Sequence, residues 1–190
     1  MNPLLLIGII AWLYLISILK RSNLSAYYFI IGSVGLFFIL IALSNRYWVW
    51  FFTHAVINSV SIYGALTHMC RLYVKYGLVY IVNNGAPVTM SIDYECSGII
   101  ETCAFVALVC FFPVYNRQQR VLIAPRGILW IYLSNVIRLI TVILIVHFAG
   151  GSQFYLAHSI IGRILFYALV IVLYYRTFTY SQITRSTQKA

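Results

Sequence analysis

The stretch SNLSAYYFIIGSVGLFFILIALSN, residues 22–45, contains no charged side chain from one end to the other. A helix needs about 20 consecutive apolar residues to cross the hydrocarbon core of a bilayer. Two further uncharged stretches of similar length run over residues 1–19 and 47–70. Together these three stretches predict a polytopic membrane protein.

The composition of the whole chain supports that prediction. Of its 190 residues, 63% are hydrophobic and only 8% are charged, whereas about a quarter of the residues are charged in soluble domains. The 13 Lys and Arg residues exceed the 3 Asp and Glu residues, for a net charge of +10. Most of these bases lie between apolar stretches, so membrane topology explains them better than nucleic-acid binding does. The composition therefore excludes an ordinary soluble domain.

The expected fold is an all-α polytopic membrane protein with about six transmembrane helices and a small extracytoplasmic β-hairpin before the fourth. The helices are expected at about residues 3–19, 26–43, 48–68, 97–115, 127–148 and 154–175. No linker or repeat divides the chain, so we expect a single membrane domain over 1–190. Its parts are the N-terminal helices in 1–70, the hairpin in 71–95, the helices with the candidate chemistry in 96–175 and a basic cytoplasmic tail in 176–190.

The hairpin is predicted from an alternation of residue types. Apolar and polar side chains alternate along one short segment. The apolar residues in it are Val88, Met90, Ile92 and Tyr94. Asn84 and Gly85 provide turn residues before it. The edges of an open hairpin cannot face lipid, because their backbone groups would stay unpaired in hydrocarbon. We therefore expect the hairpin at the membrane surface.

Basic residues indicate the orientation. One cluster lies between the fourth and fifth predicted helices and another follows the sixth, comprising Arg117, Arg120, Arg126, Arg176, Arg185 and Lys189. The positive-inside rule places both segments in the cytoplasm, so the hairpin and the start of the fourth helix face outward. Lys20 and Arg21 do not fit this orientation, since six crossings with a cytoplasmic C-terminus place their loop outside.

The candidate ionisable and nucleophilic side chains are few. The three acidic residues lie within nine positions and surround Cys96; they are Asp93, Glu95 and Glu101. Arg138 lies well inside a predicted span, where an ionisable group is costly and indicates function. Counted from the outer face at about 1.5 Å per residue, His158 is about 6 Å deep and Arg138 about 15 Å deep. With Cys96 at that face, the thiol, the imidazole and the long Arg138 side chain are expected to meet.

Such a trio has a defined chemical use. A helix N-terminus and nearby cations favour the thiolate, which is the attacking form of cysteine. The histidine takes the thiol proton and later returns it to a leaving amine. Arg138 holds the developing oxyanion or clamps a substrate carboxylate. Asn135 lies on the same helical face as Arg138 and orients it or adds a hydrogen bond.

Other reactive side chains have structural interpretations. Cys103 and Cys110 follow Cys96 at steps of seven along one helix, so they are read as part of an apolar stripe rather than as disulfide partners. His54, His68 and His147 are interpreted as interfacial or packing residues. No close-spaced Cys and His pattern indicates a metal site, and no cofactor is expected.

These residues resemble the exosortase/archaeosortase family of membrane cysteine transpeptidases, in particular the small Gram-positive exosortase G branch. The resemblance lies in ECSGI at 95–99, NVIR at 135–138 and HSIIGRILF at 158–166, in that order and spacing. It implies that Cys96 is the nucleophile, Arg138 the essential arginine and His158 the catalytic histidine. The supporting residues are Glu95, Ser97, Gly98, Asn135 and Gly162.

The resemblance also implies a substrate and a location. The partner would be an exported protein with a C-terminal sorting signal, made of a short motif, a transmembrane helix and a basic tail. Cleavage would occur near the extracytoplasmic face of a prokaryotic plasma membrane, through a Cys96 thioester that passes to an acceptor. The hairpin edge is a candidate for holding the extended scissile segment.

Two other functions remain open from the sequence. The first is a non-catalytic membrane scaffold, in which Arg138 and Arg163 bind a lipid phosphate or an acidic residue of a partner helix; it predicts an inert Cys96. The second is a small transporter in which Glu101 and His158 relay protons, although no pair of inverted halves is evident.

Overall fold

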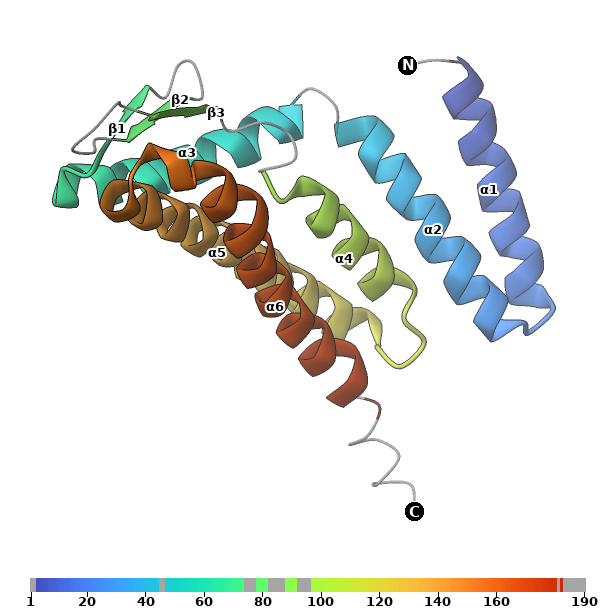
Figure 1. The fold of residues 1–190 in the computed structure, drawn as a ribbon. Helices are drawn as coiled ribbons and strands as arrows, with labels where there is room; N and C mark the ends of the chain where they lie inside the picture. The colour runs from blue at the N-terminus through green and yellow to red at the C-terminus, as the bar shows by residue number, and fades with distance from the viewer. Residues whose placement is uncertain are drawn as a thin grey trace. The chain divides into compact units, whose positions relative to one another are not determined.

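The structure is a computed structural model, and it describes residues 3–44, 47–73, 78–81, 88–91, 97–180 and 182. It is mostly helical (Figure 1). The α-helices are α1 (Pro3–Arg21), α2 (Ser25–Ser44), α3 (Tyr47–Thr67), α4 (Ile99–Phe111), α5 (Arg117–Ala149) and α6 (Gly162–Tyr174). Short helical segments flank α6: the 3₁₀-helix η3 (Gly151–Gln153) and the π-helices η4 (Leu156–Ile161) and η5 (Tyr175–Thr179). All six predicted helical segments therefore contain helix.

Four helical stretches in the described part of the chain are long and apolar enough to cross a membrane. They are Ser25–Ser44, Trp48–Thr67, Arg117–Ala149 and Gly151–Thr179. The α4 helix is also apolar but shorter, with 13 residues. These lengths and compositions are consistent with the helical membrane protein that the sequence predicts.

Two predicted helix boundaries were wrong. The α5 helix begins at Arg117 rather than at residue 127, so the basic segment before residue 127 is helical and not a loop. Pro125 and Gly127 favoured a break, but Pro125 removes only one intrahelical hydrogen bond, and the preceding residues are good helix formers. The α4 helix ends at Phe111 rather than at 115, because Pro113 disfavours the helical conformation of the residue before it.

The predicted two-stranded hairpin is a three-stranded antiparallel sheet. Its strands are β1 (Cys70–Tyr73), β2 (Leu78–Ile81) and β3 (Val88–Ser91), in the order β1-β2-β3. The alternation is confirmed within β3, where Met90 is buried and Thr89 is exposed. Ile92, Tyr94 and the Asn84–Gly85 turn lie outside the described residues. The additional strand, β1, was not predicted.

The chain forms two compact units, and the first contains Met1–Asn45 and Ile100–Ile128. In this unit α2 presents small residues to aromatic side chains. A Cβ atom at Gly32 would collide with Phe111, and one at Gly35 would collide with Trp12. The Trp12 indole N–H also donates a hydrogen bond of 3.0 Å to the Ile31 carbonyl oxygen. Glycine is therefore required where these aromatic rings approach the α2 backbone.

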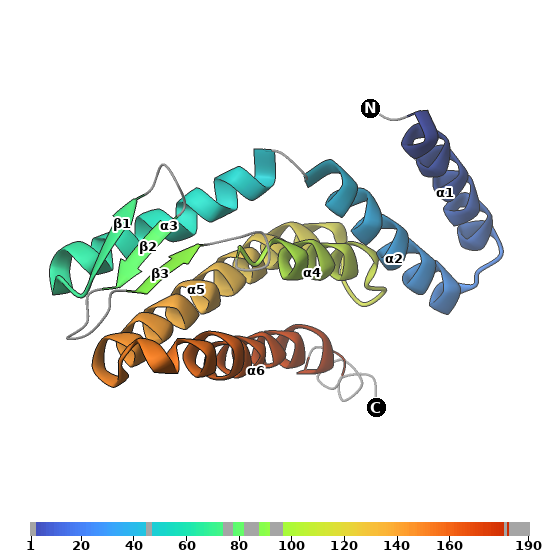
Figure 2. The same ribbon diagram turned by 45° about the horizontal axis from the view of Figure 1, so that its top comes forward.

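The second unit contains Arg46–Ile99 and Leu129–Ala190 and carries the sheet. One face of the sheet packs on α3 and α5, and both views show β1 beside α3 (Figures 1 and 2). Its core comprises Val56, Ile57, Val60, Cys70, Val79, Ile81, Met90, Leu139, Val142, Ile143, Val146 and Ala157. Two hydrogen bonds tie the helices together. The Tyr132 hydroxyl donates to the Ala55 carbonyl oxygen at 3.2 Å, and the Trp130 indole N–H donates to the Leu169 carbonyl oxygen at 2.9 Å.

Candidate active site

The first and second motifs touch each other inside the second unit. Gly98 has a φ of +71°, a left-handed conformation that glycine adopts without steric cost. A Cβ atom at Gly98 would lie 3.5 Å from Ile131 Cγ2 and 3.7 Å from Asn135 Nδ2. Ser97 is buried, and its hydroxyl oxygen accepts a hydrogen bond of 3.4 Å from the Ile99 N–H at the start of α4. The turn before α4 is thus seated against the Asn135 turn of α5.

Asn135 and Arg138 are two buried polar residues on α5. Asn135 is fully buried and Arg138 is 5% exposed. Their spacing of three residues puts both side chains on one face of the helix. The central guanidinium carbon of Arg138 lies 5.8 Å from the centre of the Phe166 ring, within the range of a cation–π interaction. Phe166 therefore gives the buried cation a favourable aromatic surface on α6.

The second and third motifs meet at Gly162. A Cβ atom there would lie 3.4 Å from Arg138 Cγ, 3.1 Å from Val142 Cγ2 and 3.0 Å from the Ala157 carbonyl oxygen. The separations from Val142 and Ala157 are tighter than most contacts that real Cβ atoms make, and the separation from Arg138 is close to ordinary van der Waals contact. The absence of a side chain at Gly162 thus allows α5 to approach α6 at the position of Arg138.

His158 lies in a π-helical turn directly before α6. In this turn the Gly162 N–H bonds to the Ala157 carbonyl oxygen, five residues earlier. Isolated π-turns are frequent at functional sites. The His158 ring is half-buried and parallel to the Phe154 ring, with centroids 5.5 Å apart and an interplanar angle of 6°. Arg138 contacts α6 at Gly162 and Phe166, in the turns that follow the histidine.

The π-turn also shifts which side chains of this segment face inward. The buried positions are Ala157, Gly162 and Phe166, so the first interval is five residues and the second is four. Arg163, the next residue after Gly162, is exposed.

Two predicted site residues, Cys96 and Glu95, lie outside the described residues. Cys96 is joined covalently to Ser97, which is the nearest described position of that motif. Of the other predicted residues, Gly98 lies against Asn135 and Arg138 lies against Gly162, whereas the contact given for His158 is with Phe154. Two aromatic residues had been given no role by the sequence: Phe154 and Phe166. Both follow the helical i, i+4 spacing, from His158 and from Gly162 respectively, and that spacing could have indicated them.

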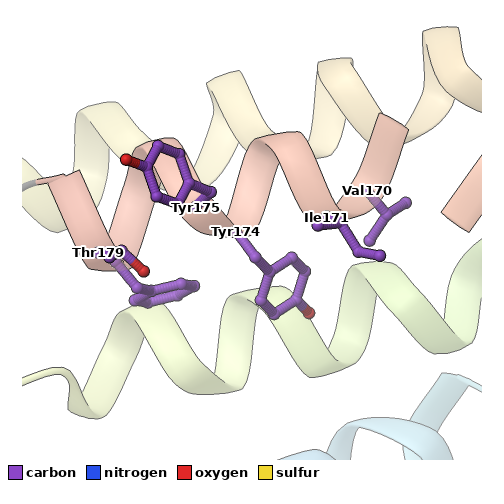
Figure 3. Close-up of a pocket in the computed structure, with 6 residues that line it drawn as sticks. Val170, Ile171, Tyr174, Tyr175 and Thr179 are labelled. Carbon is purple, nitrogen blue, oxygen red and sulfur yellow. The ribbon is translucent and has the colours of Figure 1, made fainter. Parts of the chain in front are cut away.

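The remaining cysteines and a surface pocket lie elsewhere. Cys70, Cys103 and Cys110 are free thiols. Within the described residues, no group of three His, Cys, Asp or Glu side chains could hold a metal ion. An apolar surface pocket of about 590 Å³ lies on α6 and η5 (Figure 3), and its lining residues are Val170, Ile171, Tyr174, Tyr175, Phe178 and Thr179. Val170 is about 18 Å along the helix from His158, so this pocket is separate from the candidate site.

Comparison of the chain with family models, with curated proteins and with solved structures found no match.

Proposed function

We propose that this protein is a membrane-embedded cysteine peptidase or transpeptidase of the exosortase/archaeosortase type. One observation carries the proposal. Three segments that are far apart in the sequence meet in one unit, through Gly98 with Asn135 and through Arg138 with Gly162. The same three segments hold the motifs on which the resemblance rests. A buried arginine at their junction is costly in a membrane protein and favours function over packing.

The reaction would begin with transfer of the Cys96 thiol proton to His158. The thiolate attacks the carbonyl carbon of the scissile peptide bond, and the resulting oxyanion is held by Arg138. Collapse of this intermediate breaks the C–N bond, and the leaving amine takes the proton from His158. The product is a thioester on Cys96, which water or an acceptor amine then resolves while the thiol regains its proton.

The described side chains support these roles. The Phe166 ring lies 5.8 Å from the central carbon of the Arg138 guanidinium, and a planar guanidinium can bind an oxyanion or a carboxylate through two N–H groups. Asn135, fully buried one turn before Arg138, adds an amide beside the same site. The Phe154 ring restricts the rotation of His158. Side chains that are already held in one orientation favour catalysis, because the reacting groups need little further ordering.

The substrate we propose is an exported protein with a C-terminal sorting signal that ends in a transmembrane helix. In this proposal the chain crosses a prokaryotic plasma membrane about six times, with the site near the extracytoplasmic face. β3 is an edge strand of the sheet and precedes Ser97 by a short segment. An extended substrate segment can pair with such an edge, which would present its peptide bond beside the Cys96 motif.

Thiol reactivity tests the proposal without a known substrate. Alkylation of Cys96 is measured against pH in detergent, in a background with Cys103→Ala and Cys110→Ala. We expect a half-maximal rate well below about pH 8.5 that moves upward in His158→Ala. An ordinary or inert thiol would favour the alternative, a non-catalytic membrane scaffold that binds lipid or a partner helix.

Substrate processing provides the second test. An exported reporter with a C-terminal hydrophobic helix and basic tail is expressed with each variant. Cys96→Ala, Arg138→Ala and His158→Ala should abolish processing, whereas Cys110→Ala should leave it unchanged. Hydroxylamine should release the reporter from Cys96 if a thioester accumulates. Processing that survives Cys96→Ala would refute the covalent mechanism.

A further inference from the structure

The α5 helix is longer than a bilayer requires. Its 33 residues extend about 50 Å at about 1.5 Å per residue, whereas the hydrocarbon core is about 30 Å thick. To fit entirely within that core, a straight helix would have to tilt by more than about 50°, beyond the range of about 0–40° for transmembrane helices. Part of α5 therefore lies outside the hydrocarbon.

The N-terminal part of α5 is the part that fits an interface. Residues 117–128 contain three arginines, whereas the remaining 129–149 segment is about 30 Å long and matches the hydrocarbon core. Pro125 has no N–H to donate to the carbonyl oxygen of Val121, four residues earlier. Such an open carbonyl is costly in hydrocarbon but is readily solvated at the membrane surface.

The arrangement of side chains around this segment is that of an interfacial helix. At about 100° per residue, Val121, Leu122 and Pro125 share one face, and Arg117 and Arg126 lie at its two edges, about 180° apart. All five side chains are exposed, Val121 to 72% and Leu122 to 56%.

The opposite side of the segment is used for packing within the first unit. A Cβ atom at Gly127 would collide with the Phe105 ring of α4. The arginine-edged face is thus directed away from α4. An apolar stripe with basic edges can bury its apolar residues among acyl chains while the arginines extend toward headgroups.

We propose that residues 117–126 of α5 form a binding site for anionic phospholipid. Arg117 and Arg126 bind the headgroup phosphates, and Val121 and Leu122 enter the acyl region. Charge complementarity selects this ligand, because each basic residue near an anionic leaflet adds a favourable electrostatic term. The site is independent of the Cys96 chemistry, so either proposal can fail without the other.

Photo-crosslinking in membranes tests this site. The photoreactive residue p-benzoylphenylalanine replaces Leu122 in the full chain, which is reconstituted in vesicles of phosphatidylcholine and phosphatidylglycerol at a ratio of 4:1. Phe38 of α2, which is 63% exposed, is the matched control position. Mass spectrometry of the lipid adducts should show phosphatidylglycerol enriched at least about threefold at Leu122 relative to Phe38.

The arginines are tested in the Leu122-labelled protein. Arg117→Gln with Arg126→Gln should reduce the phosphatidylglycerol fraction to that at Phe38, and about 0.5 M salt should reduce it in the unsubstituted protein. Arg21→Gln with Arg176→Gln removes the same charge elsewhere and should leave the enrichment intact. Equal lipid fractions at Leu122 and Phe38, adducts to protein instead of lipid, or an equal loss in the control variant would overturn the proposal.

Discussion

Replacing Gly162 with alanine tests the packing that holds Arg138 against α6. The new Cβ atom would lie 3.0 Å from the Ala157 carbonyl oxygen and 3.1 Å from Val142 Cγ2, and each contact must open by a few tenths of an ångström. Overpacking of this kind costs about 1–3 kcal/mol. Alanine recovers about 1 kcal/mol of helix propensity. We therefore expect a net loss of about 0–2 kcal/mol in the free energy of unfolding.

A second glycine separates the two contributions. A Cβ atom at Gly8 of α1 would meet no atom of the described residues within 4 Å beyond its own stretch of helix, so Gly8→Ala reports helix propensity alone. Thermal unfolding in detergent should rank Gly162→Ala below Gly8→Ala, by about 2–4 °C for each kcal/mol of packing cost. Displacement of Arg138 should also reduce reporter processing about tenfold or more. Equal melting temperatures for the two variants would refute the close approach of α5 and α6.

Three further predictions concern the sheet and the turn before α4. Gly98→Ala should lower the free energy of unfolding by about 1–2 kcal/mol, because the left-handed backbone is strained in alanine, and Gly98→Asn should cost less; equal losses in a denaturant titration would contradict this. Burial raises the pKa of the Cys70 thiol above its ordinary value of 9.0, so its contribution to stability should be lost as the pH rises from about 9 toward the folded pKa, and Cys70 should resist alkylation at pH 8 until the protein unfolds. Neighbouring residues of a strand direct their N–H groups to opposite edges, so only one of Val88→Pro and Thr89→Pro removes an outward donor of β3. That variant should reduce processing without changing Cys96 alkylation or the melting temperature, and unchanged processing in both variants would count against pairing of the substrate with β3.

The positions of the helices could be predicted from the sequence because lipid imposes a length and a composition on them. The uncharged residues of α2 have no alternative to a helix within hydrocarbon, where every backbone N–H and C=O group must find a partner inside the segment. The start of α5 could not be predicted in this way. Pro125 and Gly127 are signals of a helix end in water, but here the helix passes through both, because Pro125 removes only one intrahelical hydrogen bond and the residues before it are good helix formers.

The candidate site was predictable only in part. Residue types and spacing indicated Arg138 and His158, and a resemblance supplied their roles. The π-turn at His158 has no signal in the sequence, because an apolar helix tolerates an extra residue without breaking its pattern. The contact of Arg138 with Gly162 depends on side-chain packing between helices, which periodicity does not specify.

The π-turn before α6 separates the orientation of His158 from the packing of α6 on α5, which one regular helix would otherwise have to combine. Because Gly162 follows Ala157 at an interval of five residues, the His158 segment and the packing face of α6 are offset in phase. Deletion of a single residue, such as Ser159, would restore the ordinary helical spacing and rotate His158 by about 100° relative to Gly162. The number of residues in the π-turn therefore sets the direction of the imidazole. It does so without changing the contact between α6 and α5 at Gly162.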